Sequence, residues 1–270
     1  MGHYTSLLTI SLAHAKPLRR KRCQEPLIDK PPHAGEPEWV MGRPHRTAPG
    51  GLVYHVLNRA NARQPIFKKD EDYHAFERVL AAVQERVGMR VLAYCLMPNH
   101  WHLVLWPRRD GDLSTFMRLL TLTHTQRWHA HRRSAGTGHL YQGRFKSFVV
   151  QQDDYLLTVC RYVERNALRA NLVKRAEEWR WGSLWRYQSG DTEARALLSE
   201  WPVKRPRNWV KRVNQPEGDA ELHSLRQAVN RGSPFGSTHW VGRVVSRLGL
   251  ESTLRPRGRP RRERLRDAEG

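Results

Sequence analysis

The alternation of apolar and polar residues predicts a strand, a helix and a hairpin in the first half of the chain. The run GLVYHVLNR has the two-residue alternation of a strand and is opened by the Gly50-Gly51 pair, so order is expected to begin near Pro49. Over Asp70–Val87 apolar residues recur at helical spacing, and Gly88 is suited to end that helix. The β-rich runs MRVLAYCLM and HWHLVLW flank Pro98-Asn99, the composition of a hairpin turn.

A second helix and a further strand are expected after the hairpin. Leu113–Arg132 has an amphipathic pattern, the segment RSAGTGHLYQGR with its three glycines indicates a loop, and FKSFVVQ indicates a short strand. Asp153 or Asp154 can cap a third helix, which the pattern continues to about Ala170. The order β-α-β-β-α-β followed by a helix predicts an α+β, ferredoxin-like (split βαβ) fold, in which an antiparallel sheet carries helices on one face.

Composition divides the chain into four parts. Residues 1–45 mix Pro, His and basic residues without periodicity, which predicts a disordered basic arm. Residues 46–190 hold the predicted fold, and residues 191–252 are expected to form a small helical extension, with helical patterns around Ala220–Asn230 and Ser237–Leu248. Residues 253–270 form a basic tail. No internal repeat is visible.

The charge balance points to a polyanionic partner. Lys and Arg number 47 against 26 Asp and Glu, a formal net charge of +21. A compact protein with this excess repels itself, and Lys or Arg placed at phosphates releases condensed counterions, so nucleic acid is the leading partner. Three widely spaced cysteines (Cys23, Cys95 and Cys160) argue against a disulfide scaffold and a zinc knuckle.

Targeting signals are not evident in the sequence. No apolar run reaches the ~18 residues of a membrane span. The basic cluster Arg19–Arg22 follows the apolar segment TSLLTISLAHA rather than preceding it, which is the wrong polarity for a secretory signal. We therefore expect a cytoplasmic, nucleoid-associated protein.

Two histidines at the start of the second hairpin strand are candidate metal ligands. His100 and His102 are two residues apart, so both side chains lie on one face of the sheet while Trp101 points to the other. Neutral imidazoles converging in this way can bind a divalent cation. With 14 histidines in the chain, a chance pair of exposed strand histidines is the competing interpretation.

The third predicted helix carries a candidate nucleophile. Tyr162 and Asn166 are four residues apart and share a helical face, and a basic stripe of Arg161, Arg165 and Arg169 runs beside them. Tyr162 can be a nucleophile whose phenolate the arginines Arg161 or Arg165 favour, with Asn166 as an oxygen ligand. The periodicity equally fits a tyrosine half-buried against the core.

Several motifs in the right order resemble the REP-associated tyrosine transposases, members of the single-tyrosine HUH transposases, in which U is a hydrophobic residue. The resemblance rests on PNHWH, GHLYQGRFKSF and YVERNALRA, and it runs from about Arg43 to Tyr187. It implies that His100 and His102 are the HUH pair, Tyr162 the nucleophile and Asn166 a third metal ligand. The family often has Pro where this chain has Ala167, and Tyr155, seven residues before Tyr162, is the rival nucleophile.

The resemblance also implies an activity. The expected protein cleaves and rejoins single-stranded, hairpin-bearing DNA through a 5′-phosphotyrosine intermediate, requires Mg²⁺ or Mn²⁺, and needs no nucleotide cofactor. It acts as a monomer or a homodimer. The alternative is a catalytically inactive or domesticated DNA-binding protein that recognises repeat hairpins. A ferredoxin-like RNA-binding domain is disfavoured, because the aromatic strands of that class are absent.

Basic residues outside the catalytic set are expected to contact DNA. The tail RPRGRPRR resembles an AT-hook core, whose extended arginines fit the minor groove of A·T-rich duplex, although a disordered basic tail without sequence preference fits equally well. The expected DNA contacts are Arg118, Arg127, Arg144, Lys146, Arg161, Arg165, Arg257 and Arg259.

Overall fold

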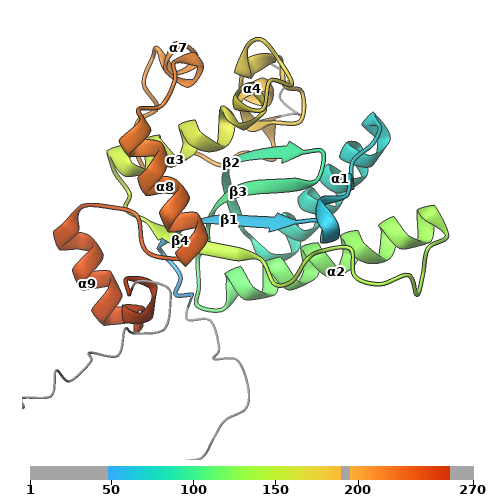
Figure 1. Cartoon of the computed structure of the whole chain (residues 1–270), viewed down its shortest axis with the longest axis horizontal. Helices are drawn as coiled ribbons and strands as arrows, with labels where there is room; N and C mark the ends of the chain where they lie inside the picture. The colour runs from blue at the N-terminus through green and yellow to red at the C-terminus, as the bar shows by residue number, and fades with distance from the viewer. Residues whose placement is uncertain (1–47, 190–194, 256–270) are drawn as a thin grey trace, which may run out of the picture. The chain divides into compact units, whose positions relative to one another are not determined.

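Four strands form one antiparallel sheet in the order β2-β3-β1-β4, as the computed structural model shows (Figure 1). The structure describes residues 48–189 and 195–255. The strands are β1 (Val53–Arg59), β2 (Arg90–Met97), β3 (His100–Trp106) and β4 (Lys146–Val150). This order confirms the ferredoxin-like prediction. The arm expected over residues 1–45, Cys23, and Arg257 and Arg259 of the basic tail lie outside the described residues.

Two helices cover one face of the sheet. They are α1 (Asp70–Val87) and α2 (Asp112–Arg132), which connect the strands of the split βαβ pattern. Their apolar stripes form a core with the residues of β1 and β3 that point to this face, among them Val56 and Leu103. Gly88 ends α1 in the left-handed conformation, with φ 69°, where a side chain would be strained.

The opposite face of the sheet is covered by α3 (Asp154–Glu164). Asp153 caps this helix, because its carboxylate accepts a hydrogen bond of 2.9 Å from the backbone N–H of Tyr155. The prediction of one continuous helix to about Ala170 is wrong. α3 ends at Arg165, a turn residue whose backbone angles (φ −81°, ψ −5°) remain in the right-handed region, and the chain continues as the short α4 (Asn166–Arg169). The side chain of Arg165 is bonded to distant backbone carbonyls, a tertiary contact that periodicity does not reveal.

The chain after the sheet packs back onto α3 and onto the edge strands β2 and β4. Its elements are η2 (Ala176–Glu178), α5 (Ser183–Gln188), α7 (Trp209–Asn214), α8 (Asp219–Arg231), α9 (Thr238–Leu248) and η3 (Glu251–Thr253). One further short helix, η1 (Asn61–Arg63), lies earlier in the chain and follows β1. The helical patterns expected around Ala220–Asn230 and Ser237–Leu248 are confirmed by α8 and α9. Within the part of the chain that the structure describes, no helix is long and apolar enough to cross a membrane.

A buried carboxylate joins α3 to this later part of the chain. Glu164 accepts hydrogen bonds from the hydroxyl of Ser183 at 2.7 Å and from the indole N–H of Trp209 at 2.6 Å. Burial raises the pKa of the Glu164 carboxyl, and the two donors and Arg205 oppose that shift. Ser183 of α5 and Trp209 of α7 therefore hold the end of α3, the helix that carries Tyr162.

Candidate active site

The two histidines of the PNHWH segment lie on the face of the sheet that α3 covers. The ring centroids of His100 and His102 are 5.2 Å apart. Trp101 belongs to the core on the other face, where its indole N–H donates to the hydroxyl of Tyr141 at 3.0 Å. The alternation predicted from the sequence is therefore present, and it directs both imidazoles to the α3 side.

Both imidazoles are neutral at neutral pH. Burial lowers the pKa of His100 to about 4, helped by the positive charges of Arg59 and Arg169. Burial also holds the pKa of His102 well below its ordinary value, with further contributions from His55 and His100. A neutral imidazole has a free nitrogen lone pair, which is the form that binds metal.

Each of these rings has a hydrogen-bond partner at Nδ1. His100 Nδ1 is 2.6 Å from Oδ1 of Asn99, whose amide NH₂ donates to the carbonyl of Arg63. His102 Nδ1 is 2.9 Å from Nε2 of His55. With both Nδ1 atoms engaged, Nε2 is the nitrogen that each ring can offer to a metal.

Tyr162 lies beside this pair. Its ring meets that of His102 edge-on at a centroid distance of 5.8 Å and that of His55 at 6.2 Å, and its side chain is buried. The rival Tyr155 packs edge-on against Phe235 at 5.4 Å. Of the two tyrosines, Tyr162 is the one that the fold brings into ring contact with the histidines.

Asn166 is buried at the start of α4, a helix that packs against β2. Cys95 of β2 is the partner of His102 in the β2–β3 register, so α4 lies on the strand next to the histidine strand. The side-chain Nδ2 of Asn166 is buried without a hydrogen-bond partner among the described residues. An orphaned buried amide is costly, and a 180° rotation about its last torsion would place its oxygen there instead.

This donor set fits a divalent cation. Two imidazole nitrogens and an amide oxygen suit Mn²⁺, and Mg²⁺ is acceptable when water and phosphate oxygens complete its coordination. No group of three His, Cys, Asp or Glu side chains positioned to hold a metal occurs in the described ranges, so carboxylate ligands are not part of this set. Because this ligand set contains no carboxylate, a phosphate could supply both further oxygen ligands and the negative charge that balances the cation.

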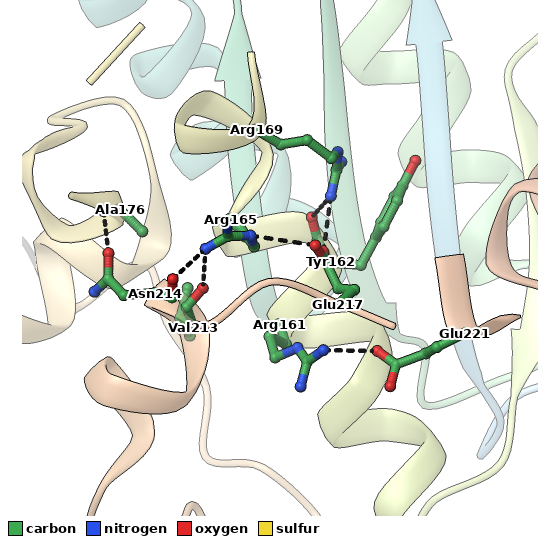
Figure 2. A network of polar contacts seen from close by, with 9 residues as sticks. All are labelled: Arg161, Tyr162, Arg165, Arg169, Ala176, Val213, Asn214, Glu217 and Glu221. Atoms are coloured by element: carbon green, nitrogen blue, oxygen red, sulfur yellow. Dashed lines mark hydrogen bonds and ion pairs between the residues drawn. The ribbon is translucent and has the colours of Figure 1, made fainter. Parts of the chain in front are cut away.

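Three arginines of the α3–α4 segment are held by the C-terminal helical part, as Figure 2 shows. Arg161 pairs with Glu221 at 3.0 Å. Arg165 pairs with Glu217 at 3.2 Å and donates to the carbonyls of Val213 and Asn214. Arg169 pairs with the other oxygen of Glu217 at 2.9 Å, and the Glu217 side chain is only 3% exposed.

The cation at the candidate nucleophile is Arg169. Its guanidinium carbon lies 4.1 Å from the centroid of the Tyr162 ring (Figure 2). The sequence-based expectation gave this part to Arg161 or Arg165. All three arginines pair with a glutamate, and it is Arg169 whose guanidinium lies over the Tyr162 ring. The sequence contained the signal, since Arg169 continues the same basic stripe one turn further on.

The expected DNA contacts divide between the two faces of the sheet. Arg118 and Arg127 are exposed on α2, on the face away from the histidines. Lys146 is exposed on β4 and pairs with Leu57, which in turn pairs with His102, so this row of side chains lies on the histidine face. Arg144 is exposed just before β4. Lys146 thus shares a face with the histidine pair, whereas Arg118 and Arg127 lie on the opposite side of the sheet.

Part of the chain is similar to a known family. The model of the IS200-like transposases matches residues 50–166, which include β1 to β4, the histidine pair, Tyr162 and Asn166. Over these residues the chain is similar to that family. The match agrees with the resemblance that the sequence motifs indicate.

Two transposases are among the solved structures similar to the chain. One is a REP-associated tyrosine transposase bound to a REP hairpin, with 18% identity, a TM-score of 0.44, and coverage of 60% of this chain and 92% of that one. The other is a Deinococcus radiodurans protein assigned as a transposase, with 18% identity, a TM-score of 0.33, and coverage of 46% and 96%. No curated protein matches the chain.

Proposed function

We propose that this protein cleaves and rejoins single-stranded, hairpin-bearing DNA, with Tyr162 as the nucleophile and a divalent metal held by His100, His102 and Asn166. The observation that carries the proposal is the edge-on contact of the Tyr162 ring with His102, in a site where both candidate histidine ligands are neutral. A tyrosine that served packing alone would have no reason to lie against two desolvated imidazoles and a guanidinium.

The histidine pair and Asn166 supply the metal side of the site. These residues would hold a divalent cation, which would supply Lewis-acid polarisation of the scissile phosphate. His100 and His102 would bind through Nε2, because their Nδ1 atoms are bonded to Asn99 and His55. The amide oxygen of Asn166 would complete the protein ligands. Either Mg²⁺ or Mn²⁺ is compatible with this set.

Tyr162 supplies the covalent chemistry. Its hydroxyl oxygen forms a bond to the phosphorus, the P–O3′ bond breaks, the phenolic proton is released and the departing 3′ oxygen takes up a proton. The products are a 5′-phosphotyrosine and a free 3′-hydroxyl. Reversal by a 3′-hydroxyl rejoins the strand, and because the adduct conserves the phosphodiester energy, no nucleotide cofactor is required.

Arg169 is placed to assist both partners of this reaction. Its guanidinium over the Tyr162 ring favours the negative charge that develops on the phenol oxygen. It retains donors for a phosphate oxygen beyond those used by Glu217 and the Tyr162 carbonyl. We assign it the part that the sequence had given to Arg161 or Arg165.

The recessed site favours a single strand as substrate. Tyr162 is 8% exposed and His102 is 3% exposed, so a phosphate must enter between α3 and the sheet to reach them. A flexible single strand can place one phosphate there, whereas a rigid duplex presents its backbone on a wide cylinder. The hairpin in the substrate is carried over from the motif resemblance. The alternative, a domesticated DNA-binding protein, has no need of this clustered set.

The test is formation of a covalent adduct. The full chain is incubated with hairpin-bearing single-stranded oligonucleotides and Mg²⁺ or Mn²⁺, and a denaturation-resistant protein–DNA band is sought. We expect wild type and Tyr155→Phe to form the band and Tyr162→Phe to form none. His100→Ala with His102→Ala should abolish it while leaving most DNA binding. An adduct in Tyr162→Phe, or none in wild type on any such substrate, refutes the proposal.

A further inference from the structure

His55 lies in the middle of β1, outside the motifs that single out the active site. It is 1% exposed and points to the same face as the histidine pair. Val104 is its partner in the β1–β3 register, and Leu57 is the partner of His102, so His55 and His102 are diagonal neighbours. A buried polar ring in a central strand requires an explanation, because desolvating it costs free energy unless it is hydrogen-bonded.

The contact between the two rings constrains their protons. His55 Nε2 and His102 Nδ1 are 2.9 Å apart, a hydrogen bond that needs one proton between the two nitrogens. Neither ring has an ion pair with a carboxylate in the described part of the chain. Two neutral rings leave two arrangements, since either His55 donates from Nε2 or His102 donates from Nδ1.

Only one arrangement leaves His102 able to bind a metal. If His55 donates, His102 must carry its own proton on Nε2, and that atom has no lone pair to offer. If His102 donates from Nδ1, its Nε2 is free. We propose that His55 is a positioning residue which accepts the Nδ1–H of His102 and so holds His102 in the tautomer that can bind metal through Nε2. This inference rests on the proposed function, which makes His102 a metal ligand.

His100 has an equivalent partner, which supports the inference. Asn99 cannot turn its oxygen away from His100 without losing the bond from its amide NH₂ to the carbonyl of Arg63. Asn99 therefore accepts a proton from Nδ1 of His100 and leaves Nε2 free. Both histidines would then offer Nε2 to the metal, because each Nδ1–H donates to an acceptor of its own, Asn99 for His100 and His55 for His102. Such partners of metal-binding histidines orient the ring and raise its basicity.

The ring of His55 is fixed by packing rather than by a second polar group. It stacks at a tilt on Phe148 of β4 with centroids 4.8 Å apart, and it meets the edge of Tyr162. The same residue thus contacts the ligand and the candidate nucleophile. A change at His55 should first alter the tautomer of His102 and only then the metal affinity, which typically falls about 10–100-fold when such a partner is lost.

The experiment reads the tautomer without relying on activity. Long-range ¹H–¹⁵N NMR of the metal-free full chain distinguishes protonated from unprotonated ring nitrogens of His102. We expect the Nδ1–H form in wild type, a shift toward the Nε2–H form in His55→Phe, and recovery in His55→Gln, whose amide oxygen can accept. Asn99→Ala is the matched control and should alter the signals of His100 alone. Mn²⁺ titration, followed by electron paramagnetic resonance, should show affinity reduced about 10–100-fold in His55→Phe.

The outcomes separate the two proposals. The inference is overturned if wild-type His102 carries its proton on Nε2, or if His55→Phe changes neither tautomer nor Mn²⁺ affinity. If His55→Phe does not fold, the wild-type tautomer and the His55→Gln titration decide the question. A wild-type protein with the Nδ1–H tautomer that forms no DNA adduct would refute the proposed function and leave the positioning of His102 by His55 intact.

Discussion

Single side chains differ in their response to acid, and His124 gives the clearest case away from the active site. It is 4% exposed in the core between the sheet and α2, with Nδ1 at 2.6 Å from the hydroxyl of Tyr141, which also accepts from Trp101. Burial lowers the pKa of His124 to about 3. The folded protein therefore excludes a proton that the unfolded chain binds near pH 6.5.

Stability should fall as the solution is acidified. The unfolded state takes up the His124 proton below about pH 6.5 and the folded state only near pH 3, so the free energy of unfolding is highest above that window. It decreases by about 1.4 kcal/mol per pH unit within the window. Urea denaturation at pH 7, 6 and 5 measures this dependence, to which other buried histidines add. In His124→Gln the free energy of unfolding should depend less steeply on pH, by about 1.4 kcal/mol per pH unit, because one fewer proton is taken up on unfolding. An unchanged pH dependence would contradict the assignment to His124.

Local rules were sufficient for some site residues and not for others. Strand alternation alone places His100 and His102 on one face, because the side-chain direction of neighbouring residues is set by the backbone. The partnership of His55 with His102 depends on the β1–β3 register, and that of Asn99 depends on a carbonyl of Arg63. Both are contacts between distant parts of the chain, which single-sequence patterns do not specify.

At the scale of elements, Glu217 joins the C-terminal helical part to two arginines of the α3–α4 segment. We expect Glu217→Ala to lower the free energy of unfolding by about 3–5 kcal/mol, because it leaves the mostly buried guanidinium groups of Arg165 and Arg169 without their common partner. The rate of adduct formation should fall as well, since Arg169 would no longer be held over Tyr162. Thermal unfolding and a timed cleavage assay measure the two effects.

Glu221→Ala is the matched control for this change. Its side chain is 33% exposed and pairs with Arg161 alone, so the expected loss of stability is below about 1 kcal/mol and cleavage should be retained. Equal effects of the two substitutions would show that Glu217 has no special connection to the active site. Arg169→Lys adds a further check, because a lysine keeps the charge but loses the planar donors.

The helices and strands themselves were well predicted, whereas the long-range contacts that hold them in place were not. The six elements of the ferredoxin-like pattern follow from apolar periodicity. Single residues such as Gly88 and Asp153 indicate where α1 ends and where α3 begins. The break at Arg165 could not be found in this way, since LLTVCRYVERNALR continues a helical pattern across it. The interruption accompanies hydrogen bonds to Val213 and Asn214, nearly fifty residues further on.

For the whole molecule, the excess of positive charge predicts strongly salt-dependent DNA binding. With a formal net charge of +21, several phosphates should be neutralised, and each contact contributes about 0.7 to the slope of log affinity against log salt for a single strand. Lys146→Ala, on the histidine face, should lower that slope by about 0.7. Exposed Arg86 on α1 is the control and should leave it unchanged when replaced by Ala. Binding that hardly varies between low and high salt would contradict the electrostatic role.

Later segments of the chain pair with both edge strands of the sheet, β2 and β4. Phe235 pairs with Val150 on β4, and Gly182 pairs with Cys95 on β2 while Ser199 donates to the carbonyl of Val91. Unpaired borders of a sheet attract strands from other molecules, which leads to aggregation. The later segments therefore cover both edges of the sheet. A chain shortened to residues 50–166 would lose this cover, together with Arg169, and we expect it to aggregate.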